Sequence, residues 1–180
     1  PMNVLGQRLD VLYKHEEMYS LMQALNIEES IDDLRYDKVI LATDADVDGL
    51  HIRNLMLTFF LHYFEPLIRQ ERFYILETPI FRVRNKEQTI YCYTDQDMDA
   101  AIKTLKAKSK ADRSIETTRF KGLGEISPPE FKQFIGADMR IRLVRLDRLS
   151  EVGRVLKFYM GKNTPERKQY IMDHLIVRPV

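Results

Sequence analysis

The stretch KVILATDADVDGLHIR, from Lys38 to Arg53, decides the fold class that the sequence predicts. Lys38–Thr43 is apolar and β-branched, which predicts a buried strand. His51–Phe64 follows with apolar residues at helical spacing, and Phe73–Leu76 predicts a second strand. Two strands with a helix between them make a βαβ unit, so we expect an α/β sheet with helices on its faces.

The rest of the chain predicts further elements on either side of this unit. Arg8–Asn26 carries apolar residues at helical spacing, and a short turn is expected at Ser30–Leu34. Ile80–Arg84 and Thr89–Tyr93 alternate apolar and polar residues, which predicts a hairpin. The middle of the chain is expected to form a helix that Asp95 caps and that runs to Lys106, a surface loop at Lys106–Arg113, and a strand at Ser114–Phe120. The last part is expected to form a helix from the capping-box sequence Ser127–Glu130 to Ile135, a strand at Arg140–Leu146, a helix that ends near Gly161, and a helix opened by Asn163–Glu166.

Composition and charge indicate a globular protein and exclude several other classes. The chain has 180 residues, 44% of them hydrophobic, and a formal net charge of +1. Its apolar runs are too short for a membrane helix, it shows no signal peptide, and its single cysteine, Cys92, cannot form an internal disulfide. The arginines between Arg140 and Arg154 predict either a solvated face or a phosphate-facing surface.

Three aspartates, Asp44, Asp46 and Asp48, follow the first predicted strand at alternate positions. The carboxyl end of a strand is the edge at which α/β sheets bind ligands, and neighbouring carboxylates need a positive partner. Such a set suits Mg²⁺, which prefers oxygen ligands and keeps several waters. The alternative is a plain interaction module in which Asp48 only caps the following helix.

Two other motifs share part of this pattern. An EF-hand calcium loop that began at Asp44 would need a glutamate at its twelfth position, where the chain has Leu55. A phosphatase of the haloacid-dehalogenase type would use Asp46 and Asp48, but it also needs a later acidic pair that the sequence does not supply. The calcium loop is therefore excluded, and a magnesium-dependent phosphatase stays an alternative.

A second motif, RFKGLGEIS at Arg119–Ser127, combines a lysine with two glycines in a predicted loop. Gly122 and Gly124 allow a tight turn or a close backbone approach, and Lys121 offers a positive charge to a phosphate. Together with TDADVDGLHIR, LTFF and YILETPIFRV, in order along nearly the whole chain, this motif resembles the B subunits of bacterial type IIA DNA topoisomerases. The topoisomerase IV form is the closer likeness, and the gyrase form is the near alternative.

The resemblance implies a Toprim-type, Rossmann-like sheet with flanking helices at 1–113 and a helical C-terminal tail at 114–180 that holds the RFKGLGE loop. It implies Mg²⁺ ligands at Asp44 and Asp46, with Asp48 in support. Charge and position suggest DNA neighbours, which are expected to be Lys121, Arg53 and Arg119. The complete enzyme is expected to pass one DNA duplex through another in an ATP-dependent cycle. It would do so as an A2B2 heterotetramer whose A subunit carries the cleaving tyrosine. A cytoplasmic, nucleoid-associated location without membrane contact follows from the same likeness.

One part of the family pattern is missing from this sequence. The family carries an upstream Glu-Gly-Asp-Ser-Ala motif whose glutamate is a metal ligand and an acid–base group, and no glutamate before Asp44 stands in that context. We therefore expect the chain to be a fragment, with that motif, the first strand of the sheet and the ATP-binding domain before Pro1. The fragment alone is expected neither to hydrolyse ATP nor to cleave DNA.

Overall fold

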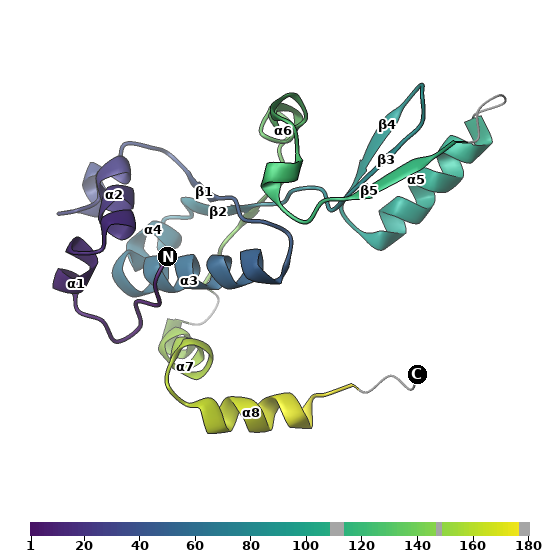
Figure 1. The fold of residues 1–180 in the computed structure, drawn as a ribbon. Coiled ribbons are helices and arrows are strands. Elements are labelled where there is room, and N and C mark those ends of the chain that lie inside the picture. Colours follow the sequence, from purple (N-terminus) through teal and green to yellow (C-terminus); the bar gives the residue numbers. More distant parts are fainter. Residues whose placement is uncertain (109–113, 147–148, 177–180) are drawn as a thin grey trace. The chain divides into compact units, whose positions relative to one another are not determined.

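The computed structural model describes residues 1–108, 114–146 and 149–176, and the chain divides into two compact units. The first unit consists of Pro1–Val39, Asn54–Phe73 and Val144–Val180, and the second consists of Ile40–Arg53 and Tyr74–Leu143. Figure 1 follows these segments by colour along the chain. The predicted division into 1–113 and 114–180 uses other boundaries and stays a prediction.

The first unit is helical in its described part. It holds α1 (Leu9–Tyr13), α2 (Glu16–Leu25), the 3₁₀ turn η1 (Ile31–Asp33), most of α3 (Val47–Tyr63), α4 (Glu65–Arg69), α7 (Leu149–Met160) and α8 (Thr164–Asp173). The two closing helices and the short turn confirm three of the predicted elements. Ser30 begins that turn, because its Oγ accepts the amide hydrogen of Asp32 with an N–O distance of 3.1 Å.

The prediction of one helix over Arg8–Asn26 was wrong in one respect, because two helices occupy this range. Lys14 and His15 separate them, and His15 adopts an extended backbone (φ −92°, ψ 105°) that interrupts the helical hydrogen bonds. The apolar pattern continues across the break, since Leu12, Met18 and Met22 are all buried. Periodicity reports which side chains are buried, and it does not register a local change in backbone direction.

Packed aromatic rings form the centre of the first unit. Phe59 and Phe60 on α3 are fully buried, and their ring centroids lie 5.0 Å apart. Phe60 also lies 4.4 Å from Phe73, and Phe59 lies 5.2 Å from Phe64, in both cases between ring centroids. Tilted and edge-on rings at these distances add favourable contacts to the burial of apolar surface. The apolar stripe that predicted this helix is therefore the stripe that forms the core.

The second unit holds two three-stranded sheets, apart from the first residue of β1 and of β2. One sheet has the strand order β1 (Val39–Leu41), β2 (Phe73–Leu76) and β6 (Ile141–Leu143). β2 and β6 pair antiparallel, with Ile75 opposite Arg142. Because α3 connects β1 to β2 and these strands are neighbours, the sheet has the strand order that the predicted βαβ unit requires.

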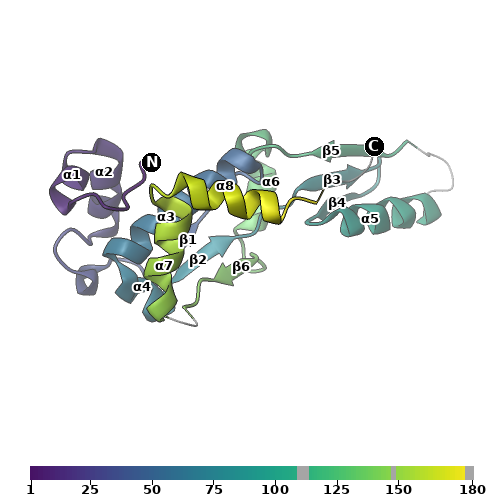
Figure 2. The ribbon, with the colours of Figure 1, turned by 90° about the horizontal axis from the view of Figure 1, so that it is seen from below.

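The other sheet has the order β4 (Thr89–Cys92), β3 (Phe81–Arg84) and β5 (Glu116–Arg119), and both pairings are antiparallel. Helix α5 (Asp95–Lys108) covers one face of it in both views (Figures 1 and 2). Between the sheet and this helix lie the buried side chains of Phe81, Val83, Cys92, Ala101 and Leu105. This packing confirms the predicted hairpin and the predicted strand after it.

Helix α5 differs from the prediction at its start and at its end. Thr94, not Asp95, caps the helix: Thr94 Oγ1 accepts the amide hydrogen of Asp97 at 3.0 Å, and Asp97 Oδ2 accepts that of Thr94 at 3.1 Å. This reciprocal pair is a capping box, with aspartate in the place of glutamate. The helix runs to Lys108, beyond the predicted end, and the rest of the predicted surface loop, 109–113, lies outside the described residues.

Helix α6 (Pro128–Phe134) begins where the sequence predicted it. Glu130 Oε2 accepts hydrogen bonds from Ser127 N at 3.2 Å and from Ser127 Oγ at 2.6 Å, which completes the capping box. Phe134 packs edge-on against Tyr91 of β4, with ring centroids 4.8 Å apart. The helix therefore covers part of the sheet face opposite α5 and anchors the loop that precedes it.

Candidate metal and nucleic-acid site

The aspartate turn forms the start of α3. Asp46 Oδ1 accepts the amide hydrogen of Gly49 at 2.7 Å, and the carbonyl oxygen of Asp46 accepts that of Leu50 at 3.0 Å. Asp46 is thus the residue that caps the helix, whereas Asp48 lies exposed in its first turn. The alternative of a plain interaction module named Asp48 as the cap, and the structure places the cap two positions earlier, at Asp46. The cap also explains why α3 begins at Val47, four residues before the predicted start at His51.

Asp44 joins this turn to the second motif. Its Oδ1 accepts the amide hydrogen of Leu123 at 2.6 Å, although the two residues are 79 positions apart in the chain. Leu123 begins a 3₁₀ turn, η2 (Leu123–Glu125), inside the RFKGLGE loop. The loop is also closed on itself, because Glu125 Oε2 accepts the amide hydrogen of Lys121 at 3.0 Å. The structure therefore brings together the two motifs that the sequence singled out.

Two glycines make this close approach around Asp44 feasible. A Cβ atom at Gly49 would lie 2.1 Å from the carbonyl oxygen of Asp44, a distance that only a shift of the backbone could relieve. A Cβ atom at Gly122 would lie 3.1 to 3.3 Å from the carboxylate atoms of Asp44. By contrast, nothing lies within 4 Å of the Cβ position of Gly124. Gly49 and Gly122 thus serve the close packing at Asp44, and neither has a positive φ.

Two carboxylates of the turn suit what Mg²⁺ needs from a protein. Among the described residues, Oδ2 of Asp44 and Oδ2 of Asp46 have no hydrogen-bond partner, so each is available to a cation. The same part of the chain contains no group of three or more His, Cys, Asp or Glu side chains that could hold a metal ion. The three aspartates thus do not form a closed cage. Because Mg²⁺ usually takes one or two carboxylates together with water and phosphate oxygens, an open pair fits it, and the ligand roles stay a prediction.

The three basic residues expected near DNA lie in different surroundings. Lys121 is exposed in the RFKGLGE loop, and Leu123, two residues further along that loop, donates a hydrogen bond to Asp44. Arg53 is half-buried on α3, and its Nε donates to Oγ1 of the buried Thr43 at 3.2 Å. Arg119 ends β5, and its guanidinium carbon lies 5.6 Å from the ring centroid of Phe81. Lys121 is therefore two residues from Leu123, which contacts Asp44, and Arg53 contacts Thr43, which precedes Asp44. Among the contacts of the described residues, none joins Arg119 to the aspartates.

A solvent-open cavity of about 400 Å³ adds residues that the sequence analysis did not assign to the site. Its lining includes Arg53 together with Glu77, Tyr93, Arg140 and Arg142. Burial lowers the pKa of the Arg53 guanidinium, the positive charge of Arg142 lowers it further, and Glu77 opposes both. The arginine-rich run after residue 139 was the feature of the sequence that indicated a phosphate-facing surface. The sequence pattern did not show that this run lies next to Arg53.

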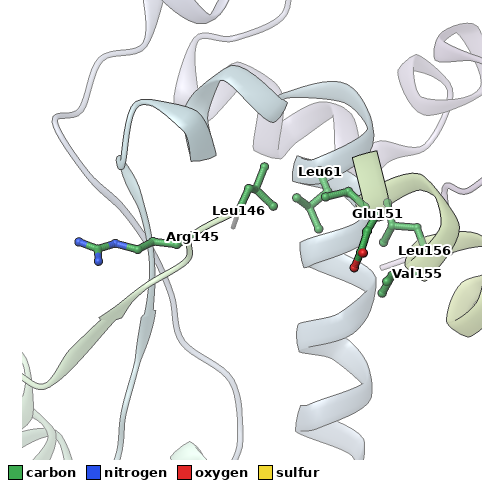
Figure 3. A pocket seen from close by; sticks show the side chains of 7 residues that line it. Leu61, Arg145, Leu146, Glu151, Val155 and Leu156 are labelled. Carbon is green, nitrogen blue, oxygen red and sulfur yellow. The ribbon is translucent and has the colours of Figure 1, made fainter. Parts of the chain in front are cut away.

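A second cavity of about 400 Å³ lies in the first unit between α3 and α7 (Figure 3). Its lining is mainly apolar and comes from Leu61, Arg145, Leu146, Glu151, Val152, Val155 and Leu156. The guanidinium of Arg145 points away from the leucines in this view. Its described lining carries one arginine and one glutamate, compared with three arginines in the cavity around Arg53, so we assign it no functional role.

Comparisons with known proteins agree with the geometry. Residues 3–78 match the Toprim domain family. The chain is 54% identical over 178 residues to the B subunit of DNA topoisomerase 4 from Borreliella burgdorferi, and the match covers 98% of this chain and 28% of that protein. It is 33% identical over 181 residues to the B subunit of DNA gyrase from Thermotoga maritima, where the match covers 97% of this chain and again 28% of that protein. The chain therefore spans little more than a quarter of the length of these relatives.

A solved structure supports the same fold. It is described as the Plasmodium falciparum topoisomerase II DNA-binding, cleavage and re-ligation domain. The likeness has a TM-score of 0.67 at 19% identity and covers 98% of this chain and 24% of that one. The predicted Toprim-type α/β fold is thus confirmed. In the described part of the chain, none of the helices combines the length and apolarity needed to cross a membrane.

Proposed function

Because the chain contains a Toprim domain and is a homologue of the B subunits of type IIA DNA topoisomerases, we propose that it forms part of the DNA-cleaving region of such an enzyme. The hydrogen bond from Leu123 N to Asp44 Oδ1 carries this proposal, because it unites the acidic turn and the RFKGLGE loop in one site. The complete enzyme would change DNA topology by ATP-dependent passage of one duplex through another. ATP would bind outside this chain.

Mg²⁺ would be held by Asp44 and Asp46, with Asp48 in support. When bound, it would stabilise charge on the scissile phosphate and on the leaving oxygen. The chain itself orients the ligands: Leu123 N fixes one oxygen of Asp44, and Gly49 N fixes one oxygen of Asp46. Each carboxylate therefore presents its other oxygen in a set direction, without rearrangement of the turn.

Double-stranded DNA would contact the basic residues around this turn. Lys121 is exposed in the loop next to Asp44, and Arg53 donates a hydrogen bond to Thr43, the residue that precedes Asp44. Arg119 would contact the phosphate backbone of the DNA further along the duplex. Contacts of this kind neutralise phosphates and position the duplex, and they carry no sequence information.

The tail would bind the A subunit in an A2B2 assembly located in the bacterial cytoplasm with the nucleoid. Its α7–α8 segment exposes large apolar side chains, which a folded domain normally covers. The exposed fractions are 54% for Tyr159, 61% for Ile171, 60% for Met172 and 58% for Leu175. The A subunit would supply the cleaving tyrosine.

The metal assignment can be tested in the complete enzyme with Asp44→Asn and Asp46→Asn. Asparagine keeps the oxygen that accepts from Leu123 or Gly49, and it is as good a helix cap as aspartate, so the fold should survive. We expect Mg²⁺-dependent DNA cleavage to be lost while the melting temperature and DNA binding stay near the wild-type values. Asp99→Asn, an exposed aspartate on α5, is the matched control. Wild-type cleavage by both site variants would show that the metal assignment is wrong.

The two other functions considered predict different results for this chain. A magnesium-dependent phosphatase would release phosphate from a generic phosphate ester, and the comparisons give no support to it. An interaction module would keep all its activity in both asparagine variants, since the helix cap is preserved. We expect the 180-residue chain alone to hydrolyse neither ATP nor a phosphate ester.

A further inference from the structure

The open cavity in the second unit borders the aspartate turn directly. Ala45, which stands between Asp44 and Asp46, contributes to its lining. Three arginines from two elements meet there: Arg53 comes from α3, Arg142 comes from β6 and Arg140 directly precedes β6. This cavity is distinct in composition from the acidic turn that would hold the metal ion.

Each guanidinium of this group has its own anchor. Arg53 Nε donates to Thr43 Oγ1, and Arg142 forms an ion pair with Glu77. The guanidinium carbon of Arg140 lies over the Tyr93 ring, 3.9 Å from its centroid, which is within the range of a cation–π contact. Side chains that are oriented before a ligand arrives lose less freedom when they bind it. The cavity therefore has the features of a built site for an anion.

The charges that line the cavity do not cancel locally. Glu77 is engaged with Arg142, and Asp97 Oδ2 accepts the amide hydrogens of Tyr93 and Thr94 at 3.2 and 3.1 Å. Asp97 thus serves the start of α5 and makes no ion pair with the arginines among the described contacts. In the part of the chain that the structure describes, the guanidinium groups of Arg53 and Arg140 form no ion pair with a carboxylate, and Glu77 acts on Arg53 only through its charge.

We propose that this cavity binds a phosphate group through Arg53, Arg140 and Arg142. The planar guanidinium matches two phosphate oxygens at once, and several of them around one anion relieve their mutual repulsion. A cavity of about 400 Å³ has room for a phosphate with its water shell or for a nucleotide unit. The phosphate could belong to the DNA backbone or to a free phosphate compound. Its assignment to DNA rests on the proposed function, whereas phosphate binding as such does not.

The 180-residue chain, pyrophosphate and a short DNA duplex are sufficient for a test. Titration without Mg²⁺, at fixed ionic strength, gives the dissociation constant for each probe. We expect Arg53→Gln and Arg140→Gln each to weaken pyrophosphate binding about tenfold, as the loss of a charge-assisted hydrogen bond implies. Arg84→Gln removes an exposed arginine of the same unit, which pairs with Glu116, and should leave the affinity within about twofold of the wild type.

A measurement on the wild-type chain makes the test independent of how the variants fold. Pyrophosphate should shift the side-chain N–H resonances of Arg53 and Arg140, and it should leave that of Arg84 in place. If the duplex competes with pyrophosphate and depends on the same arginines, the phosphate is that of DNA. If only pyrophosphate depends on them, the site takes a free phosphate compound. Equal affinities in all folded variants, with no selective shift, would overturn the proposal.

The test of phosphate binding and the test of the metal assignment can fail independently of each other. If Asp44→Asn and Asp46→Asn left DNA cleavage intact in the complete enzyme, the metal assignment would fail. Arginine-dependent binding of pyrophosphate by the 180-residue chain would not change, because the aspartates take no part in it.

Discussion

Replacing Glu130 by glutamine tests how the loop beside Asp44 is anchored. Glu130 lies in the first turn of α6, directly after the loop, and its Oε1 accepts hydrogen bonds from Arg82 Nη1 at 2.7 Å and from Tyr91 Oη at 3.0 Å. Its Oε2 accepts from both Ser127 N and Ser127 Oγ. The side chains of Glu130 and Arg82 are only 17% and 16% exposed, so solvent screens this ion pair weakly.

These partners lower the pKa of Glu130 from 4.5 to about 2, and the largest cause is the hydrogen bond from Ser127, followed by that from Arg82. One pKa unit corresponds to about 1.4 kcal/mol, so the ionised carboxylate contributes about 3 kcal/mol to folding near neutral pH. Because the pKa is lower in the folded state than in the unfolded state, this contribution is complete above the unfolded value. It is lost as the pH falls from 4.5 to about 2.

Urea unfolding of the wild type and of Glu130→Gln, followed by circular dichroism at several pH values, measures this contribution. We expect the variant to be less stable by about 2–3 kcal/mol near neutral pH, and the two curves to converge as the pH approaches the folded pKa. The matched control is Glu116→Gln. Glu116 pairs with Arg84 at 2.8 Å, but the two side chains are 56% and 44% exposed, so its loss should cost less than about 1 kcal/mol.

Two results would refute this reasoning. One is a loss of stability in Glu130→Gln no larger than that in Glu116→Gln. The other is a difference from the wild type that stays constant throughout the acid range, because a contribution from the ionised carboxylate must vanish when it is protonated.

Two further substitutions test the loop and the tail. Gly122→Ala would bring a methyl group to 3.1 Å from the Asp44 carboxylate. We expect this substitution to weaken the hydrogen bond from Leu123 N to Asp44 by roughly 0.5–1.5 kcal/mol and to shift the Leu123 amide resonance. Gly124→Ala, the control, should have neither effect. An unchanged resonance in Gly122→Ala would contradict the close approach. Arg167→Gln removes a donor that reaches the carbonyl oxygens of residues 159 and 161 at 2.8 Å each, so amides of α8 should exchange faster by a factor that corresponds to about 1–3 kcal/mol. Lys168→Gln is the exposed control, and equal exchange in both variants would show that Arg167 does not hold the α7–α8 corner.

Local chemistry made much of the fold readable from the sequence. The capping box of Ser127 and Glu130 predicted α6, because the donor and acceptor that close it are three residues apart. The apolar stripe on α3 predicted the buried face that includes Phe59 and Phe60. The strands were shorter than predicted, since β1 is Val39–Leu41 and β6 is Ile141–Leu143. Strand ends depend on where a partner strand stops, which is not a local property.

For the candidate site, too, the sequence predicted some features and left others undetermined. The sequence by itself determined that Asp44, Asp46 and the loop at Lys121–Glu125 carry the chemistry worth testing, because charge and glycine content belong to the residues themselves. It did not single out Asp46 as the cap of α3, since Asp46 and Asp48 are both suitable caps and only the backbone path selects one.

Only the tertiary structure determined which residues distant in the sequence lie close together. It brought Leu123 to Asp44 across 79 positions, and it collected Arg53, Arg140 and Arg142 in one cavity. Both arrangements depend on how sheet and loop pack, which is a balance of burial and close fit over many residues. A sequence pattern with a period of two or about four residues carries no information on such distant pairs.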